Sequence, residues 1–127
     1  MRPAKITALI LFILIISLGI CEQIYIGNTF KKFDGYTDFF EKSIEANDFV
    51  AAENKMTEFT QWWEKRSAVL ESLAHNRDIK TVTQEIAQLK AYIIIRNAPD
   101  AAVSVITLKS MTESLRRLLS FRFEHIV

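Results

Sequence analysis

The chain has 127 residues, of which 50% are hydrophobic and 24% are charged, so its length allows one domain and a short additional segment. The formal net charge is +1, and this balance lacks the basic surplus that is typical of nucleic-acid-binding proteins, so we expect no nucleic-acid partner. The one cysteine, Cys21, excludes an intrachain disulfide and a zinc cluster built from several cysteines.

The N-terminal segment from Ile6 to Cys21 carries no charged residue. A membrane-spanning helix needs about twenty apolar residues, and the segment reaches this length with its neighbours. We therefore expect residues 1–27 to form an uncleaved signal anchor that contacts membrane lipid, and residues 28–127 to form a soluble helical domain. Two alternatives stay open, namely a cleaved secretory signal and a lipoprotein signal that ends at Cys21.

The charges on either side of the apolar segment predict its orientation. Arg2 and Lys5 precede the segment, whereas Lys31 and Lys32 follow it at a greater distance. Because positive charge is retained in the cytoplasm, we expect a single-pass protein of the cell membrane with a cytoplasmic N-terminus and an extracytoplasmic C-terminal domain. The margin is about one charge.

After the anchor, apolar residues recur three and four positions apart, which is typical of amphipathic helices. The first stripe runs from Ile26 to Ile44, on a helix that either continues the anchor or is separated from it near Gly27 and Gly35. Asp48 is the expected N-cap of the next helix. The expected stripe residues are Ile26, Phe30, Phe33, Phe40 and Ile44, followed in the second helix (residues 49–75) by Phe49, Ala52, Met56, Phe59, Trp63, Leu70 and Leu73.

Two further helices follow the same spacing. The third is expected at residues 79–97, and Pro99 suits the first turn of the fourth, with Asn97 or Ala98 near its cap. Their stripes are Ile79, Val82, Ile86, Leu89 and Ile93, and then Ala102, Val105, Leu108, Thr112, Leu115 and Leu119.

The predicted fold class is all-α, with an N-terminal transmembrane helix followed by a small antiparallel helical bundle. Short loops favour antiparallel neighbours. A weak repeat at an offset of 50 pairs Ile44 with Ile94 and Asn47 with Asn97. It indicates an alternative in which two similar helical hairpins stack on each other.

Three short motifs carry a resemblance to a known family. They are Cys21 to Ile26 directly after the apolar segment, Trp62 to Lys65, and Leu89 to Ile93. With these motifs the chain resembles a domain-of-unknown-function family of short, membrane-anchored helical proteins of spore-forming Gram-positive bacteria. The resemblance implies a bacterial cell-membrane setting, and it brings no activity and no functional residues.

The sequence contains no pattern of catalytic or cofactor-binding residues. His75 and His125 are the only histidines, and neither stands in a spacing that brings several metal ligands together. The three glycines are scattered, so no phosphate-binding loop exists, and no G-x-S-x-G motif is present. We therefore expect no catalysis, no metal and no cofactor.

Aromatic and basic residues are the candidates for an interaction surface. Trp62 and Trp63 point about 100° apart on a helix, which places Trp63 in the core and Trp62 at the edge of the stripe, and Phe39 stands beside Phe40 in the same way. Arg116, Arg117 and Arg122 alternate with apolar residues, as in helices that contact anionic lipid. The more common role of such residues is packing for the aromatic pairs and solvation for the arginines.

These observations predict a membrane-tethered interaction or scaffold protein of the bacterial envelope, whose partner is another membrane or envelope protein. Tethering raises the effective concentration of a membrane-bound partner, so that a weak contact suffices. The alternative is an accessory module that binds a small apolar ligand or lipid between its helices, with Phe59, Trp62, Trp63 and Tyr92 as lining residues.

Overall fold

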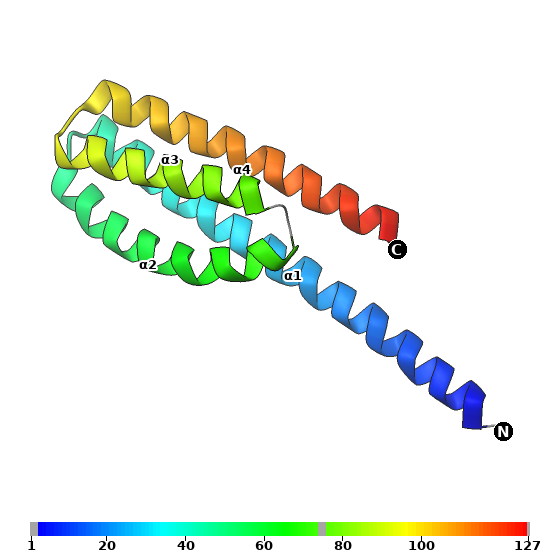
Figure 1. The fold of residues 1–127 in the computed structure, drawn as a ribbon. Helices are drawn as coiled ribbons and strands as arrows, with labels where there is room; N and C mark the ends of the chain where they lie inside the picture. The colour runs from blue at the N-terminus through cyan, green and yellow to red at the C-terminus, as the bar shows by residue number, and fades with distance from the viewer. Residues whose placement is uncertain (1–2, 74–75, 127) are drawn as a thin grey trace.

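The computed structural model describes residues 3–73 and 76–126, together with their side chains except those of residues 73, 76 and 120–126. Its four helices are α1 (Pro3–Glu45), α2 (Phe49–Leu73), α3 (Asn76–Ile94) and α4 (Ala98–Ile126) (Figure 1). The all-α fold class is thereby confirmed. The third helix, α3, begins and ends three residues earlier in the sequence than the predicted range of 79–97. Each helix packs against its neighbours in the chain, and α4 also packs against α1.

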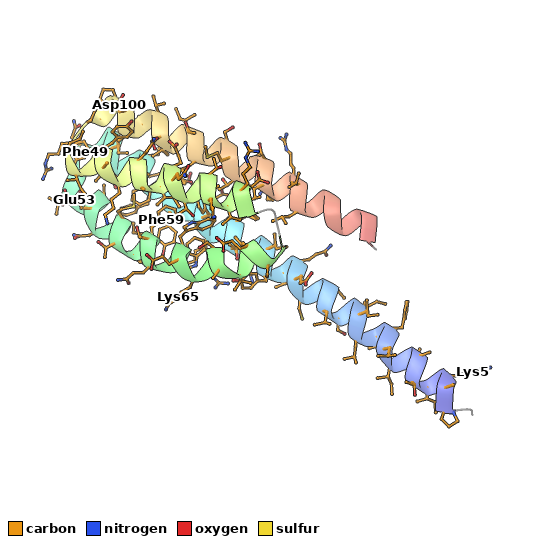
Figure 2. The ribbon with its side chains drawn as sticks, viewed as in Figure 1. Lys5, Phe49, Glu53, Phe59, Lys65 and Asp100 are labelled. Atoms are coloured by element: carbon orange, nitrogen blue, oxygen red, sulfur yellow. The ribbon has the colours of Figure 1, made fainter. Side chains whose placement is uncertain are left out.

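The first helix is unbroken over 43 residues, so the apolar N-terminal segment and the first amphipathic stripe belong to one continuous helix. An added Cβ at Gly27 or Gly35 would meet nothing within 4 Å, and the propensity cost of about 1 kcal/mol per glycine is outweighed by burial of residues such as Phe33. The N-terminal part of α1 extends away from the other helices, with Lys5 at its far end (Figures 1 and 2).

This projecting part of α1 is apolar and uncovered. An 18-residue window in it has a mean hydropathy of 2.5, and none of the window is buried. By length and composition it is the one helix among the described residues that is suited to cross a membrane, although a signal sequence near an N-terminus has the same properties. The structure therefore contains one long apolar helix that fits a membrane anchor or a signal sequence.

The turns after α1 and α3 have the same construction. After α1, Asn47 adopts a left-handed backbone conformation (φ 54°), and the N–H of Asp48 donates to the carbonyl of Ser43 at 2.8 Å. This pattern is a Schellman motif, which satisfies the free carbonyls at a helix C-terminus. Arg96, with φ 58°, repeats it after α3.

The residue after each of these turns caps the next helix, as predicted. The Oδ1 atom of Asp48 accepts from the N–H of Ala51 at 3.1 Å. In the second turn, Oδ1 of Asn97 accepts from the N–H of Asp100 at 3.2 Å, and Nδ2 of Asn97 donates to the Asp100 carboxylate at 2.8 Å. Both side chains thus replace an intrahelical partner that a first-turn N–H lacks.

The predicted stripes form the core, with one correction. Their described members are buried except Ala102, which is exposed, whereas Ala101 is fully buried. A shift of one residue rotates a helix position by about 100°, so the spacing alone did not distinguish two adjacent alanines. Leu73 lies outside the described side chains.

The burial pattern of α1 and α2 is repeated in α3 and α4 at an offset of 49, and not at the predicted offset of 50. At an offset of 50, Ile44 would match Ile94, but Ile44 is 5% exposed and Ile94 is 55% exposed. At 49, the left-handed residues, the caps and most core positions of the two helix pairs coincide. Matched buried pairs include Phe40 with Leu89, Ile44 with Ile93, Ala52 with Ala101, and Phe59 with Leu108.

Candidate functional site

The largest group of packed aromatic rings lies between α1 and α2. We call it the aromatic cluster, and its members are Phe33, Tyr36, Phe40, Phe59, Trp62 and Trp63. The ring of Phe33 meets those of Phe59 and Trp63 edge to face, with centroids 5.1 and 5.4 Å apart. Edge-to-face pairs are favourable beyond the area that they bury. Phe59 lies among the helices (Figure 2), and its ring contacts those of four other members of the cluster, namely Phe33, Tyr36, Phe40 and Trp62.

Trp63 is the inward member of the tryptophan pair, as predicted. It is 2% exposed, and its indole N–H donates to the hydroxyl of Thr83 at 2.8 Å. This bond joins α2 to α3, while the ring packs on α1. Trp63 therefore links α2 to two other helices and has a structural role.

Trp62 is half-buried rather than surface-facing. Its ring packs on Tyr36, with centroids 5.3 Å apart, and the ammonium of Lys32 lies 5.7 Å from its centroid. Its indole N–H is buried and has no acceptor among the described residues. Because a buried donor without a partner is unfavourable, Trp62 is less well matched to its surroundings than Trp63.

Phe39, the second aromatic candidate, is 36% exposed. The ammonium of Lys55 lies 5.0 Å from the Phe39 ring and 5.5 Å from the Tyr36 ring. A lysine ammonium thus lies over the ring of each candidate aromatic.

The arginines of α4 are engaged in ion pairs. Arg116 and Arg117 both pair with Glu113 on the same helix. The Arg116 guanidinium also lies near Asp34 of α1, whose pKa is raised by partial burial, an effect that the arginine opposes. Arg116 and Arg117 therefore form a neutralised network, and Arg122 lies outside the described side chains.

A second ion-pair group joins α4 to α1. The Lys109 ammonium lies 3.0 Å from Asp38 and also contacts Glu41. These contacts raise the pKa of Lys109, with the hydrogen bond to Glu41 as the main cause. Because all three side chains are more than a third exposed, the group contributes to positioning α4 more than to stability.

A surface hollow that the sequence did not single out lies between α3 and α4. We call it the α3–α4 groove, and its volume is about 570 Å³. Val82 and Leu115 are buried beneath it, while Ile106 and Leu118, at 67% and 50% exposure, stand open at its edge. The lining residues are Asp78, Thr81, Val82, Ile106, Thr107, Ser110, Met111, Ser114, Leu115 and Leu118.

The signal for this groove was present in the sequence as apolar residues outside the core stripe. Val103, Ile106 and Leu118 do not belong to the predicted stripe of α4, and all three are at least half exposed. Such positions are common on any surface when isolated. Only the packing of α3 beside them turns two of these residues into one edge of a groove.

The structure also places Tyr25 and Arg66 together where α1 leaves the domain. The guanidinium carbon of Arg66 lies 4.7 Å from the centroid of the Tyr25 ring. Arg66 occupies the gap between Trp63 and Leu70 in the apolar spacing of α2, and its half-burial agrees with a stem that covers apolar surface. Its aromatic partner from α1 was not predicted.

No group of three or more histidine, cysteine or acidic residues that could hold a metal ion occurs among the described residues. Cys21 is exposed on the projecting part of α1. His75 and His125 lie outside the described side chains.

Comparison with known proteins gives one match. A family model described as Domain of unknown function (DUF4363) matches residues 20–126. No curated protein and no solved structure matches the chain. The matched region contains all of the domain core and excludes most of the apolar N-terminal segment.

Proposed function

Since this chain belongs to the family Domain of unknown function (DUF4363), we propose for it a membrane-tethered interaction function without catalysis. The N-terminal part of α1 is its anchor, and the helical domain offers a surface to another membrane or envelope protein. The observation that carries this proposal is the α3–α4 groove, an apolar hollow that stands open on a domain attached to an apolar, unburied helix.

The proposed setting is a bacterial cell membrane, with the N-terminus in the cytoplasm and the domain outside. The uncovered apolar helix supports the anchor, and Arg2 and Lys5 before it support this orientation. Within the domain, we propose that the four helices form an antiparallel bundle of two stacked hairpins, which the repeat of burial at an offset of 49 supports.

The form of the groove favours an amphipathic helix as the bound segment. Helical proteins commonly bind such a helix in an apolar groove between two of their own helices. Ile106 and Leu118 provide apolar contact at the edge of the groove. Hydroxyl groups, among them those of Ser110 and Ser114, supply polar contacts along it.

The alternative, a small apolar ligand or lipid, is supported by the groove's volume, which lies within the range of about 300–1,000 Å³ typical of ligand sites. The site would differ from the predicted one. Phe59, Trp62 and Trp63 pack against other rings in the interior, and none of them lines the α3–α4 groove.

In-cell photocrosslinking with the full-length chain tests the proposal. A photoreactive residue at Ser110, which is exposed in the groove, is compared with one at Gln61, which is exposed on α2. We expect a protein adduct from Ser110 that is absent from Gln61 and that disappears with Ile106→Glu. Ile106 is 67% exposed, so this substitution leaves the core intact.

Two results would contradict the interaction proposal. Identical adducts from Ser110 and Gln61 would show that capture does not depend on the groove. An adduct of lipid mass at Ser110, without a protein adduct, would replace the interaction function with the ligand-binding alternative.

A further inference from the structure

The continuity of α1 fixes the distance between the domain and the apolar segment. At 1.5 Å per residue, residues 5–24 extend about 30 Å, which equals the thickness of a hydrocarbon core. Ile24 is 58% exposed, whereas Ile26 is 5% exposed and belongs to the domain core. With residues 5–24 across the bilayer, the charged side chains of Lys5 and Glu22 at its two ends reach the headgroup level, and no linker separates the domain from the lipid headgroups.

The side chains at this level are those of Tyr25 and Arg66. The headgroup region occupies several ångströms beyond the hydrocarbon on each side, and Tyr25 is the residue that directly follows the uncovered segment. Arg66 reaches it from α2, with its guanidinium carbon 4.7 Å from the Tyr25 ring centroid. The helix pair thus brings a cation to the end of the apolar segment.

The Arg66 guanidinium is suited to bind a phosphate group. A guanidinium that lies over an aromatic ring uses no N–H hydrogen bond for that contact, so its N–H groups remain available, and these match phosphate geometry in a bidentate manner. No carboxylate lies within 4 Å of Arg66 among the described residues. Glu22, three residues before Tyr25, is the nearest acidic residue along α1 and reduces the local positive potential.

We propose that Arg66, held against Tyr25 where α1 leaves the domain, binds the phosphate group of an anionic membrane lipid. This inference rests on the proposed membrane anchor. It is a different lipid contact from the one predicted for α4, where Arg116 and Arg117 pair with Glu113 and Arg116 lies near Asp34, about 15 Å along α1 from Ile24. Arg122 lies outside the described side chains.

Lipid binding by the full-length chain in a non-ionic detergent tests this assignment. The protein is titrated with phosphatidylglycerol, with phosphatidylcholine and with inorganic phosphate, and native mass spectrometry measures the bound fraction. The variants are Arg66→Gln and, as the matched control, Lys65→Gln, which removes the same charge from an exposed side chain one residue away (Figure 2).

We expect Arg66→Gln to weaken phosphatidylglycerol binding about fivefold, which corresponds to about 1 kcal/mol for one basic residue near an anionic surface. Lys65→Gln and the phosphatidylcholine titration serve as baselines. If Arg66→Gln does not fold, as judged by circular dichroism, Arg66→Lys retains the charge and loses the bidentate pair of N–H donors, and we expect it to weaken phosphatidylglycerol binding more than Lys65→Gln does.

Two outcomes overturn the lipid site. One is equal phosphatidylglycerol affinity for the Arg66 and Lys65 variants, and the other is Arg66-dependent binding of inorganic phosphate without lipid selectivity. Failure of the anchor itself is detected separately, by extraction of the full-length chain from phosphatidylcholine vesicles at alkaline pH. A chain that stays in the vesicles but shows no Arg66 effect disproves only the lipid site.

Discussion

The adjacent tryptophans of α2 allow a sharp test of how the domain is packed, because they differ in the partner of the indole N–H. The N–H of Trp63 donates to Thr83 at 2.8 Å, whereas that of Trp62 is buried without an acceptor among the described residues. Substitution by phenylalanine removes the N–H and keeps an aromatic ring. The two substitutions are therefore expected to have different effects on the free energy of unfolding.

For Trp63→Phe, the lost hydrogen bond contributes about 1 kcal/mol, and the smaller ring adds a cavity term of similar size, so we expect a loss of about 2 kcal/mol. For Trp62→Phe, the lost ring contacts are offset by removal of an unsatisfied buried donor, which costs about 1–3 kcal/mol. We expect a net change near zero. Trp63→Ala should cost about 3–5 kcal/mol, and Trp62→Ala about 2 kcal/mol, because its ring is half-buried.

Urea denaturation of a fragment with residues 22–127, followed by circular dichroism, measures these differences. The fragment retains Tyr25 and Ile26, which contact the domain. Tryptophan fluorescence is unsuitable because the substitutions remove the fluorophore. If Trp62→Phe destabilised the fragment as much as Trp63→Phe, the N–H of Trp62 would have a partner and the packing argument would be refuted. If Trp63→Ala had no effect, the buried face of α2 would be assigned incorrectly.

Three further predictions concern the turns, one titrating group and the topology. Asp48→Ala and Asn97→Ala should each lower the free energy of unfolding, as measured by urea denaturation, by about 1 kcal/mol through loss of an N-cap. If one of the substitutions had no effect, the N-cap role of that residue would be contradicted. Partial desolvation raises the pKa of Asp34, whose side chain remains exposed, above its ordinary value of 3.8, so its small contribution to stability is present below that value and is lost as the pH rises through the raised pKa. The free energy of unfolding of Asp34→Asn should therefore increase relative to that of the parent as the pH rises through this pKa. A difference between the two proteins that stays constant across pH would refute the prediction. In a Cys21→Ala background, Gln61→Cys should react with a membrane-impermeant thiol reagent in intact cells; labelling only after lysis would reverse the proposed orientation.

The sequence predicted the features that depend on neighbouring residues. Helix caps at Asp48 and Asn97 are formed within one turn of the chain, and the spacing of apolar residues follows from the helix period alone. For the same reason the inward position of Trp63 was predictable from its distance to Phe59. These features need no knowledge of where the other helices lie.

Tertiary packing decided the features in which two helices meet. It selected Ala101 over Ala102 and set the hairpin repeat at 49, because one residue rotates a face by about 100° and only a neighbouring helix shows which face is covered. It also paired Arg66 with Tyr25 and opened the groove beside Ile106. Each of these joins residues that are distant in the chain, and their approach depends on how the helices pack, which no local pattern records.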